Sequence, residues 1–519
     1  MNNSVVFGAR YAIPFRSLPG LVSVCVAEVD AKDWIRVAQL VRAEGGRLVS
    51  IWGTDQRPLA ERDVMAAVYC AAEGLLWLRL ALNLGEGYPD LSAVFPAAVR
   101  MQRVVFDLLG VRALGADDER PWLNHGRWPR DYFPLRQQTS GAEQFDNLLE
   151  SYPFVSVAGD GVHEIAVGPI HAGIIEPGHF RFSVVGEKVL RLEQRFGYAH
   201  KGTEKLFVGR TVADGARLAG RVSGDSTVAF AWAYCMAAET VRAWTIPARA
   251  EWLRALLLER ERIANHLGDL GGLGNDAGLA FGLAQFMRLK EDWVRLNGQL
   301  FGHRFMMDCV VPGGVAIDLD RAGVEALLTQ CERIELEVRA LRGIYDGHAG
   351  LQDRFIAAGR MLPKLAAELG VCGLVGRASA QAWDARADQA AGAYAELNVQ
   401  MATHRNGDVA ARVAVRFDEI FESLRLLRDL AGKLPPGPAM LALAGESGAG
   451  MGAGWIEGFR GTVFVALETD AQGAILRCHC HDPSWQNWPA LQYAIMGNIV
   501  PDFPLINKSF NLSYSGPDL

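Results

Sequence analysis

The chain has 519 residues, of which 50% are hydrophobic and 21% are charged, and its formal net charge is −7 at pH 7. A chain of this length has room for more than one domain with a large core, and its acidic balance gives no reason to expect nucleic-acid binding. No uninterrupted apolar run reaches the ~20 residues that span a bilayer, because the closest, residues 65–84, contains Glu73 and Arg79. The N-terminus lacks the basic flank and apolar run of a signal peptide, so we expect a cytoplasmic protein.

Residues 1–138 have the pattern of a small α/β domain. Apolar residues at helical spacing predict a helix over residues 31–43, which ends at two glycines. A strand over residues 47–52, a β-rich segment over 64–81 and a helix over 93–109 are expected to follow. The polar residues 139–161 contain Gly and Ser and are predicted to be a linker.

Residues 162–519 are predicted to form a second, mainly helical domain with peripheral strands. Its first residues, up to about 189, read as short β-strands separated by glycine and proline. Helical periodicity then dominates six segments, namely residues 189–209, 213–245, 249–270, 276–301, 320–358 and 386–431. After two prolines at 435–436, glycines and strands return, at 462–467 and 474–480, before a short helix at 490–496. We therefore predict an α+β fold.

The eight cysteines are scattered, and no two of them have Cys-x-x-Cys spacing. Cys478 and Cys480 stand closest and alternate with His479 and His481. On a strand, side chains two residues apart point to the same face, so we read these cysteines as a reduced pair in a cytosolic protein. No second cluster nearby in sequence completes a tetrahedral metal site.

Short motifs rich in His, Glu and Arg gather between residues 168 and 226 and at the end of the chain. They read Gly-Pro-Ile-His at 168–171, Glu-Pro-Gly-His-Phe at 176–180, Tyr-Ala-His-Lys-Gly-Thr-Glu-Lys at 198–205, Arg-Val-Ser-Gly-Asp-Ser at 221–226 and Ser-Tyr-Ser-Gly at 513–516. In these motifs the chain resembles the large subunit of membrane-bound (group 4) nickel-iron hydrogenases and the related catalytic-arm subunit of respiratory complex I. Residues 103–111 and 128–136 resemble the end of the complex I 30-kDa subunit, which implies that residues 1–138 are a docking domain.

The resemblance places the two Cys-x-x-Cys pairs that hold the hydrogenase metals at four positions of this chain. These positions are Ser223, Ser226, Ser513 and Gly516, so all four thiols are missing. Nickel bridged to iron needs soft, easily ionised sulfur donors, whereas a serine hydroxyl is a hard donor and glycine has no side chain. We therefore predict that the chain holds no metal and that hydrogen turnover is lost.

Several acidic and basic residues remain around these positions. In the hydrogenases the glutamate that matches Glu176 passes protons to and from the metal. The resemblance implies that Glu176 keeps a proton-relay role without the metal if burial raises its pKa toward neutrality. Pairing of Glu176 with a nearby Arg or Lys is an equal alternative. His171 is the candidate for contact with a quinone, although the tyrosine expected beside the first lost cysteine is Gly224 here. Asp225 is interpreted either as a proton acceptor or as the counter-ion of Arg221.

A second set of charged residues is predicted to lie farther inside the helical domain. Glu259, Arg262 and His266 are spaced so that they share one helix face. In the relatives, rows of charged residues like this one run toward the membrane arm. The resemblance therefore implies a role in proton or ion coupling for these three residues and for Glu204. A solvated helix face is the alternative, disfavoured by the apolar residues around them.

The resemblance implies an oxidoreductase subunit of a membrane-bound complex that couples electron transfer to proton or ion movement, with quinone as the expected acceptor. It implies no cofactor in this chain, a [4Fe–4S] cluster in an iron-sulfur small subunit, and antiporter-like membrane subunits and other peripheral-arm electron-transfer subunits as partners. The chain would then lie on the cytoplasmic face of the cell membrane. A non-catalytic scaffold and an active hydrogenase with unusual ligands are the alternatives.

Overall fold

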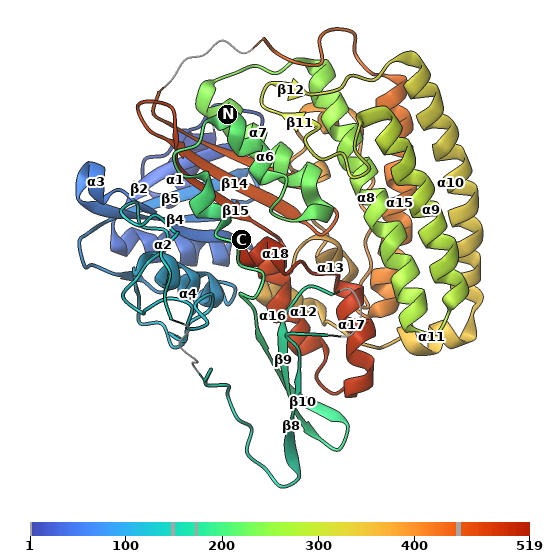
Figure 1. Ribbon diagram of the computed structural model, residues 1–519, viewed down its shortest axis with the longest axis horizontal. Helices are drawn as coiled ribbons and strands as arrows, with labels where there is room; N and C mark the ends of the chain where they lie inside the picture. The colour runs from blue at the N-terminus through green and yellow to red at the C-terminus, as the bar shows by residue number, and fades with distance from the viewer. Residues whose placement is uncertain (1–2, 147–150, 172–174, 443–447) are drawn as a thin grey trace.

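A computed structural model describes residues 3–146, 151–171, 175–442 and 448–519 of the chain (Figure 1). A blue N-terminal sheet lies on one side, a bundle of long helices lies on the other, and a red sheet from late in the sequence crosses between them. The α+β class predicted from the sequence is confirmed. Within the described ranges, no helix is both long and apolar enough to cross a membrane.

The N-terminal elements form a five-stranded sheet with helices beside it. In chain order they are α1 (Asn3–Tyr11), β1 (Arg16–Ser17), β2 (Val24–Val29), α2 (Ala31–Ala43), β3 (Arg47–Asp55), α3 (Arg57–Ala60), β4 (Arg62–Ala71), β5 (Gly74–Asn83), β6 (Tyr88–Pro89), α4 (Ala98–Leu109) and β7 (Ala113–Leu114). The strand order is β1-β2-β5-β4-β3, with β2 and β5 parallel and the other pairs antiparallel. The helix predicted over 31–43 is confirmed. The one predicted over 93–109 begins only at Ala98, because Pro96 disfavours helical geometry in the residue before it.

The later elements comprise a projecting hairpin sheet, a helix bundle and a second sheet. They are β8 (Val162–Val167), β9 (His179–Val185), β10 (Lys188–Arg195), α5 (Thr203–Phe207), α6 (Val212–Ala219), η1 (Gly224–Ser226), α7 (Thr227–Arg242), α8 (Ala248–Asp276), α9 (Ala280–Phe301), β11 (Val310–Val311), β12 (Gly314–Val315), α10 (Arg321–Gly347), α11 (Ala349–Phe355), α12 (Pro363–Leu369), α13 (Gly373–Ala378), α14 (Ala385–Asp388), η2 (Gly392–Glu396), α15 (Val409–Gly432), β13 (Gly450–Glu457), β14 (Thr462–Thr469), β15 (Ile475–His481), α16 (Ser484–Ala494), η3 (Val500–Asp502), α17 (Phe503–Phe510) and α18 (Ser515–Asp518). Helices α8, α9, α10 and α15 form the bundle (Figure 1).

Two of the helices predicted from periodicity are wrong in part. Residues 188–195 form strand β10, which pairs antiparallel with β9, and only residues 203–207 of the predicted segment 189–209 are helical. The predicted helix over 386–431 contains the short α14 and η2, and its long helix α15 begins only at Val409.

The N-terminal sheet packs directly on the second sheet, β13-β14-β15. The interface is a cluster of buried apolar side chains in which Trp52 of β3 lies 5.2 Å from Trp77 and 5.8 Å from Phe464 of β14, measured between ring centres. Buried hydrogen bonds cross the same interface, including the one from Thr54 Oγ1 to Glu468 Oε1 (2.9 Å). The sheet contact therefore fixes the N-terminal strands to the part of the chain that carries the candidate site.

Alternate glycines of β13 allow this strand to lie against α7. A Cβ added at Gly454 or Gly452 would overlap the carbonyl oxygen of Ala233 or Ala237, respectively. Two residues of a strand advance about 6.6 Å and four residues of a helix advance about 6 Å, so the two spacings match. The glycine-rich segment of the sequence is thus explained by close packing between a strand and a helix.

Candidate functional site

The four positions singled out in the sequence come together in the structure. Ser223 directly precedes η1, and Ser226 is its last residue, next to the start of α7. Ser513 lies between α17 and α18, and Gly516 lies in α18. The Oγ atoms of Ser223 and Ser513 are 3.2 Å apart, and the amide of Gly516 donates to Ser513 Oγ (2.9 Å). Ser226 Oγ accepts a hydrogen bond from Nη1 of Arg460 (3.2 Å). All of these serines are buried, so their hydroxyl groups form a closed polar cluster.

An ion pair between Asp225 and Arg460 occupies the same place. Asp225 accepts hydrogen bonds from Ser223 Oγ (2.7 Å) and from Arg460 Nη1 (2.8 Å). Burial raises the pKa of Asp225, but Arg460 outweighs burial and lowers that pKa to about 2, so the carboxylate is charged. Arg221 instead pairs with Asp308 (2.7 Å), and the counter-ion of Asp225 is therefore Arg460. Sequence reasoning did not select Arg460, which lies in the turn between β13 and β14.

The side chain of Asp482 fills the space beside Gly516. A Cβ added at residue 516 would overlap the carboxylate of Asp482. Asp482 Oδ1 accepts from the amide of Ser484 (2.8 Å), while its buried Oδ2 has no hydrogen-bond partner among the described residues. Burial raises the pKa of this carboxyl group. Position 516 consequently has no room for a side chain, and Asp482 is a second residue of the cluster that sequence reasoning missed.

Glu176 contacts the chain segment that carries Ser513. Its two carboxylate oxygens accept hydrogen bonds from the amides of Tyr514 (3.1 Å) and Ser515 (3.2 Å). The side chain is exposed in this chain, so burial does not supply the environment in which a proton-relay role was expected. Within the described residues, its hydrogen-bond partners are these backbone amides, and no Arg or Lys forms an ion pair with it.

His171 lies near the same region, with its ring centre 6.1 Å from that of Phe180. Neither of its ring nitrogens has a hydrogen-bond partner in the described part of the chain. Burial lowers the pKa of His171, which favours the neutral ring. The structure thus leaves both nitrogens of this candidate residue without a partner.

Glu204 lies at the boundary with the N-terminal sheet. It pairs with Arg477 (3.0 Å) and with Nδ1 of His479 (2.7 Å), and Nε2 of His479 accepts from Ser50 Oγ (2.7 Å). The ring of His479 stacks on Trp52 at 4.7 Å. Burial raises the pKa of Glu204, but Arg477 and His479 outweigh it and lower the pKa to about 2. Glu204 therefore links β15 to β3 as a charged group.

Cys478 and Cys480 lie on β15 with their Sγ atoms 4.0 Å apart, and both are free and buried. Strand alternation places His479 on the opposite face, where it contacts Glu204. Among the residues that the structure describes, no group of three or more His, Cys, Asp or Glu side chains is arranged to hold a metal ion.

Glu259 of α8 is at one end of a buried charge network. Its carboxylate accepts from Tyr394 Oη (2.6 Å), Ser423 Oγ (2.6 Å) and Arg262 Nε (3.2 Å), and it pairs with Arg386 (3.1 Å). Burial raises the pKa of Glu259, but Arg386 and Arg262 outweigh it and lower the pKa to about 2. The alternative of a solvated helix face is wrong, because Glu259 is fully buried.

The network continues through His266 to Glu419 of α15. His266 Nε2 lies 2.8 Å from Glu419, which also pairs with Arg377 (2.8 Å). Arg377 in turn contacts Glu457 (2.7 Å), and Arg262 donates to the backbone oxygen of Glu457 (2.6 Å). The predicted row Glu259, Arg262 and His266 is thus paired by residues of α13, α14, α15 and β13 that were not predicted.

Asp518 is a fully buried carboxyl group next to the serine cluster. Its Oδ2 accepts from the amide of Ala199 (3.0 Å), its backbone oxygen accepts from His200 Nδ1 (2.6 Å), and its Oδ1 has no partner among the described residues. Burial raises the pKa of Asp518 to about 7. The group therefore takes up a proton in the folded state within the physiological pH range.

The substitution Asp518→Asn is expected to weaken the pH dependence of stability. The folded-state pKa of Asp518 is raised above its ordinary value of 3.8. Its stabilising contribution to the free energy of unfolding is therefore complete below about pH 4 and is lost as the pH rises toward 7. The variant cannot titrate there, and its loss of unfolding free energy between pH 4 and 7 should be smaller by at least about 1 kcal/mol. Urea unfolding of both proteins at several pH values measures this difference, and parallel profiles would contradict it.

Matches to known families agree with this architecture. The family model described as respiratory-chain NADH dehydrogenase, 30 Kd subunit, matches residues 27–144, and that of the 49 Kd subunit matches residues 276–448. The chain belongs to the family that unites the large subunits of membrane-bound hydrogenases with the 49-kDa subunit of complex I, here fused to a 30-kDa-type domain. At the four positions where the sequence resemblance expects the hydrogenase cysteines, the chain carries serine or glycine.

Individual relatives cover most of the chain. It is 30% identical over 484 residues to "Formate hydrogenlyase subunit 5" of Escherichia coli (strain K12). The aligned region covers 92% of this chain and 85% of that protein. It is 25% identical over 505 residues to a subunit of the NADH-quinone oxidoreductase of Bacteroides thetaiotaomicron, covering 91% and 94%. A solved chain of "the membrane-bound sulfane sulfur reductase (MBS), an archaeal respiratory membrane complex" shares the fold, with a TM-score of 0.66, 24% identity and coverage of 70% and 100%.

Proposed function

We propose that the chain is the large subunit of a membrane-bound, complex I-like oxidoreductase that works without a nickel-iron centre. The observation that carries the proposal is the donor set of the serine cluster. A nickel-iron centre needs thiolates, whereas this cluster presents three hydroxyls, the Asp225 carboxylate and the Arg460 guanidinium. Asp482 also fills the space beside Gly516. These residues do not fit the metal pair, and no catalytic step is assigned to it.

Electrons would then come from a partner subunit. We place a [4Fe–4S] cluster in an iron-sulfur small subunit, because this chain has no Cys-x-x-Cys pair to ligate one. One relative is named as a subunit of a formate hydrogenlyase, and another is named as a subunit of an NADH-quinone oxidoreductase. A quinone is accordingly our proposed acceptor, with antiporter-like membrane subunits moving protons or other ions. The chain would lie on the cytoplasmic face of the membrane.

The buried network from Glu259 to Glu419 is our candidate for coupling electron transfer to ion movement. It is continuous across α8, α13, α14, α15 and β13, and its groups are fully desolvated. In such a network a change of charge at one group is felt strongly by its neighbours, because water does not screen it. Glu176 beside the serine cluster is the proposed point of proton exchange, and because its side chain is exposed this role would depend on contact with water and not on burial.

Analysis of the purified intact complex tests the proposal. Iron should be present, nickel should be absent by elemental analysis, and a soluble quinone should be reduced when a low-potential donor supplies electrons. Stoichiometric nickel, or hydrogen uptake that rises with nickel content, would overturn it. Iron-sulfur clusters without any quinone turnover would favour the second candidate, a non-catalytic scaffold, which the closed hydrogen-bonded serine cluster also allows.

A further inference from the structure

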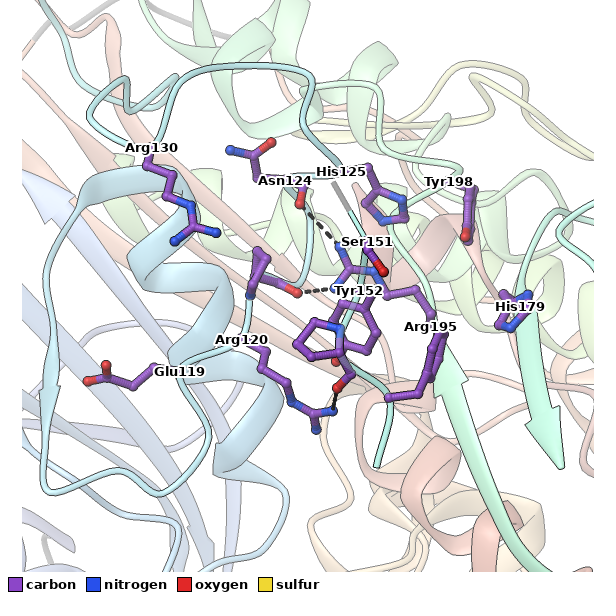
Figure 2. A pocket seen from close by; sticks show the side chains of 13 residues that line it. Glu119, Arg120, Asn124, His125, Arg130, Ser151, Tyr152, His179, Arg195 and Tyr198 are labelled. Atoms are coloured by element: carbon purple, nitrogen blue, oxygen red, sulfur yellow. Dashed lines mark hydrogen bonds between the residues drawn. The ribbon is translucent and has the colours of Figure 1, made fainter. Parts of the chain in front are cut away.

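A cavity of about 590 Å³ opens beside the hairpin sheet, away from the serine cluster. It is bounded by the loop at residues 119–130, by the extended residues 151–154 and by the paired ends of β9 and β10 (Figure 2). This volume lies in the range of about 300–1,000 Å³ that is typical of small-molecule sites. The cavity is therefore large enough for an organic ligand.

Arg195 supplies a buried positive charge to this cavity, and no carboxylate among the described residues lies close enough to be its counter-ion. Only 4% of the residue is exposed, and its guanidinium donates to the backbone oxygens of Pro121 and Asn124 and lies 4.0 Å from the ring centre of Tyr152. Burial lowers the pKa of Arg195, and Tyr152 and the more distant Asp107 offset only part of that effect. A buried charge of this kind calls for an anion.

The neighbouring Arg120, unlike Arg195, is paired with carboxylates. It also lines the cavity, but its guanidinium is paired with Asp118 (2.7 Å) and with Glu193 (2.7 Å). The positive charge of Arg120 is thus compensated within the protein. Arg130 also lines the cavity, but Arg195 is the buried arginine through which we expect the cavity to hold an anionic ligand.

His179 adds an acceptor to the same wall of the cavity. It is the cross-strand partner of Arg195, and its Nδ1 lies 2.9 Å from the carbonyl oxygen of Gly168. A carbonyl only accepts, so Nδ1 carries the proton and Nε2 of the neutral ring is an acceptor. Burial lowers the pKa of His179, which favours this neutral form. His179 is 8% exposed, and its Nε2 has no partner among the described residues.

Aromatic rings form the rest of the lining. Tyr152 and Phe154 contact each other at 4.8 Å, and Tyr198 contacts His125 at 4.5 Å, between ring centres. Figure 2 shows the ring of Tyr152 beside the guanidinium of Arg195. Flat faces of this kind favour a flat ring in the ligand by stacking or edge contacts.

We propose that this cavity binds a small organic anion whose carboxylate or phosphate is attached to a flat ring that carries a hydrogen-bond donor. The anionic group pairs with Arg195, the ring lies among the aromatic side chains, and the donor meets His179 Nε2. The site is separate from the serine cluster. Side chains alternate along a strand, so Phe180 and Phe196 point to the other face, where they contact Tyr514.

Equilibrium dialysis with the intact complex tests this site with four probes. The compounds 4-hydroxybenzoate and AMP carry a carboxylate and a phosphate, respectively, and phenol and adenosine are their neutral counterparts. At least one anion should bind at least tenfold more tightly than its counterpart, because an ionised group strengthens a hydrogen bond. The anion that binds identifies the group that the site takes. If neither anion binds, or if the neutral compounds bind equally well, the proposal is wrong.

Two variants and one control locate the binding. Arg195→Gln removes the charge, and Tyr198→Leu removes a ring that is 38% exposed, so the second variant remains informative if the first does not fold. Each should weaken binding of the anion by about tenfold. Arg321→Gln removes a charge whose side chain is 94% exposed on α10 and should leave binding unchanged. Unchanged affinity in folded Tyr198→Leu and Arg195→Gln would place the bound anion elsewhere and overturn the proposal.

Discussion

The substitution Arg377→Met is expected to destabilise the chain by about 3–5 kcal/mol, the cost of removing one partner from a buried ion pair. Arg377 is fully buried and pairs with Glu419 (2.8 Å), Glu457 (2.7 Å) and Asp384 (3.5 Å). Methionine fills much of the same volume, so the loss is mainly of charge and hydrogen bonds. Three carboxyl groups would then share fewer cations in a place that water does not reach.

Urea unfolding of the variant and of the unmodified chain measures this effect. The matched control is Arg321→Met, which removes an exposed arginine paired with Glu325 at helical spacing and should change stability by no more than about 0.5 kcal/mol. A cost for Arg377→Met as small as that of the control would show that the network does not hold this part of the fold together.

A second substitution tests which of the carboxylates is most destabilised when Arg377 is removed. Burial raises the pKa of Glu457, whereas Arg377 and His266 help to hold the pKa of Glu419 well below its usual range. Glu457 is thus the acid that most easily becomes neutral. Adding Glu457→Gln to Arg377→Met should recover part of the lost stability, and a double-mutant cycle would measure the coupling between the two residues.

The network also shows what sequence patterns can and cannot predict. Helical spacing correctly placed Glu259, Arg262 and His266 on one face of α8, because the spacing of a single helix is a local property. Their partners, among them Arg386 and Glu419, lie 127 and 153 residues away from Glu259 and His266. No local pattern connects residues so distant, so the pairing was visible only in the structure.

The serine cluster also combines residues that the sequence marked with a residue that only the structure revealed. Resemblance to a family marked Ser223, Ser226, Ser513 and Gly516, and the structure brings these four positions together. Arg460, which shares the cluster, lies in a segment noticed only for its glycines. Its role depends on a pairing with Asp225 across 235 residues. Periodicity alone also misread β10 as helix, because a strand is defined by the partner with which it pairs.

The packing of β13 on α7 is the second place where a single change should have a large effect. Gly454→Ala is expected to cost about 3 kcal/mol or more, at or above the upper end of the range for overpacking. The added methyl group would overlap the carbonyl oxygen of Ala233, which is a backbone atom of a buried helix and cannot rotate away. Either the strand or the helix must move, and β13 also pairs with β14 and carries Glu457 of the charge network.

The control is the same substitution at Gly343 on α10, where a Cβ meets nothing within 4 Å. Alanine is the better helix former by about 1 kcal/mol, so Gly343→Ala should stabilise the chain while Gly454→Ala destabilises it. Thermal unfolding of both variants tests the opposite signs. If Gly454→Ala unfolded at the same temperature as the unmodified chain, the close approach of β13 to α7 could not be the reason for glycine at this position. Because the same strand presents Glu457 to Arg377, we further expect Gly454→Ala and Arg377→Met to be non-additive, as mutations that disturb one shared contact are.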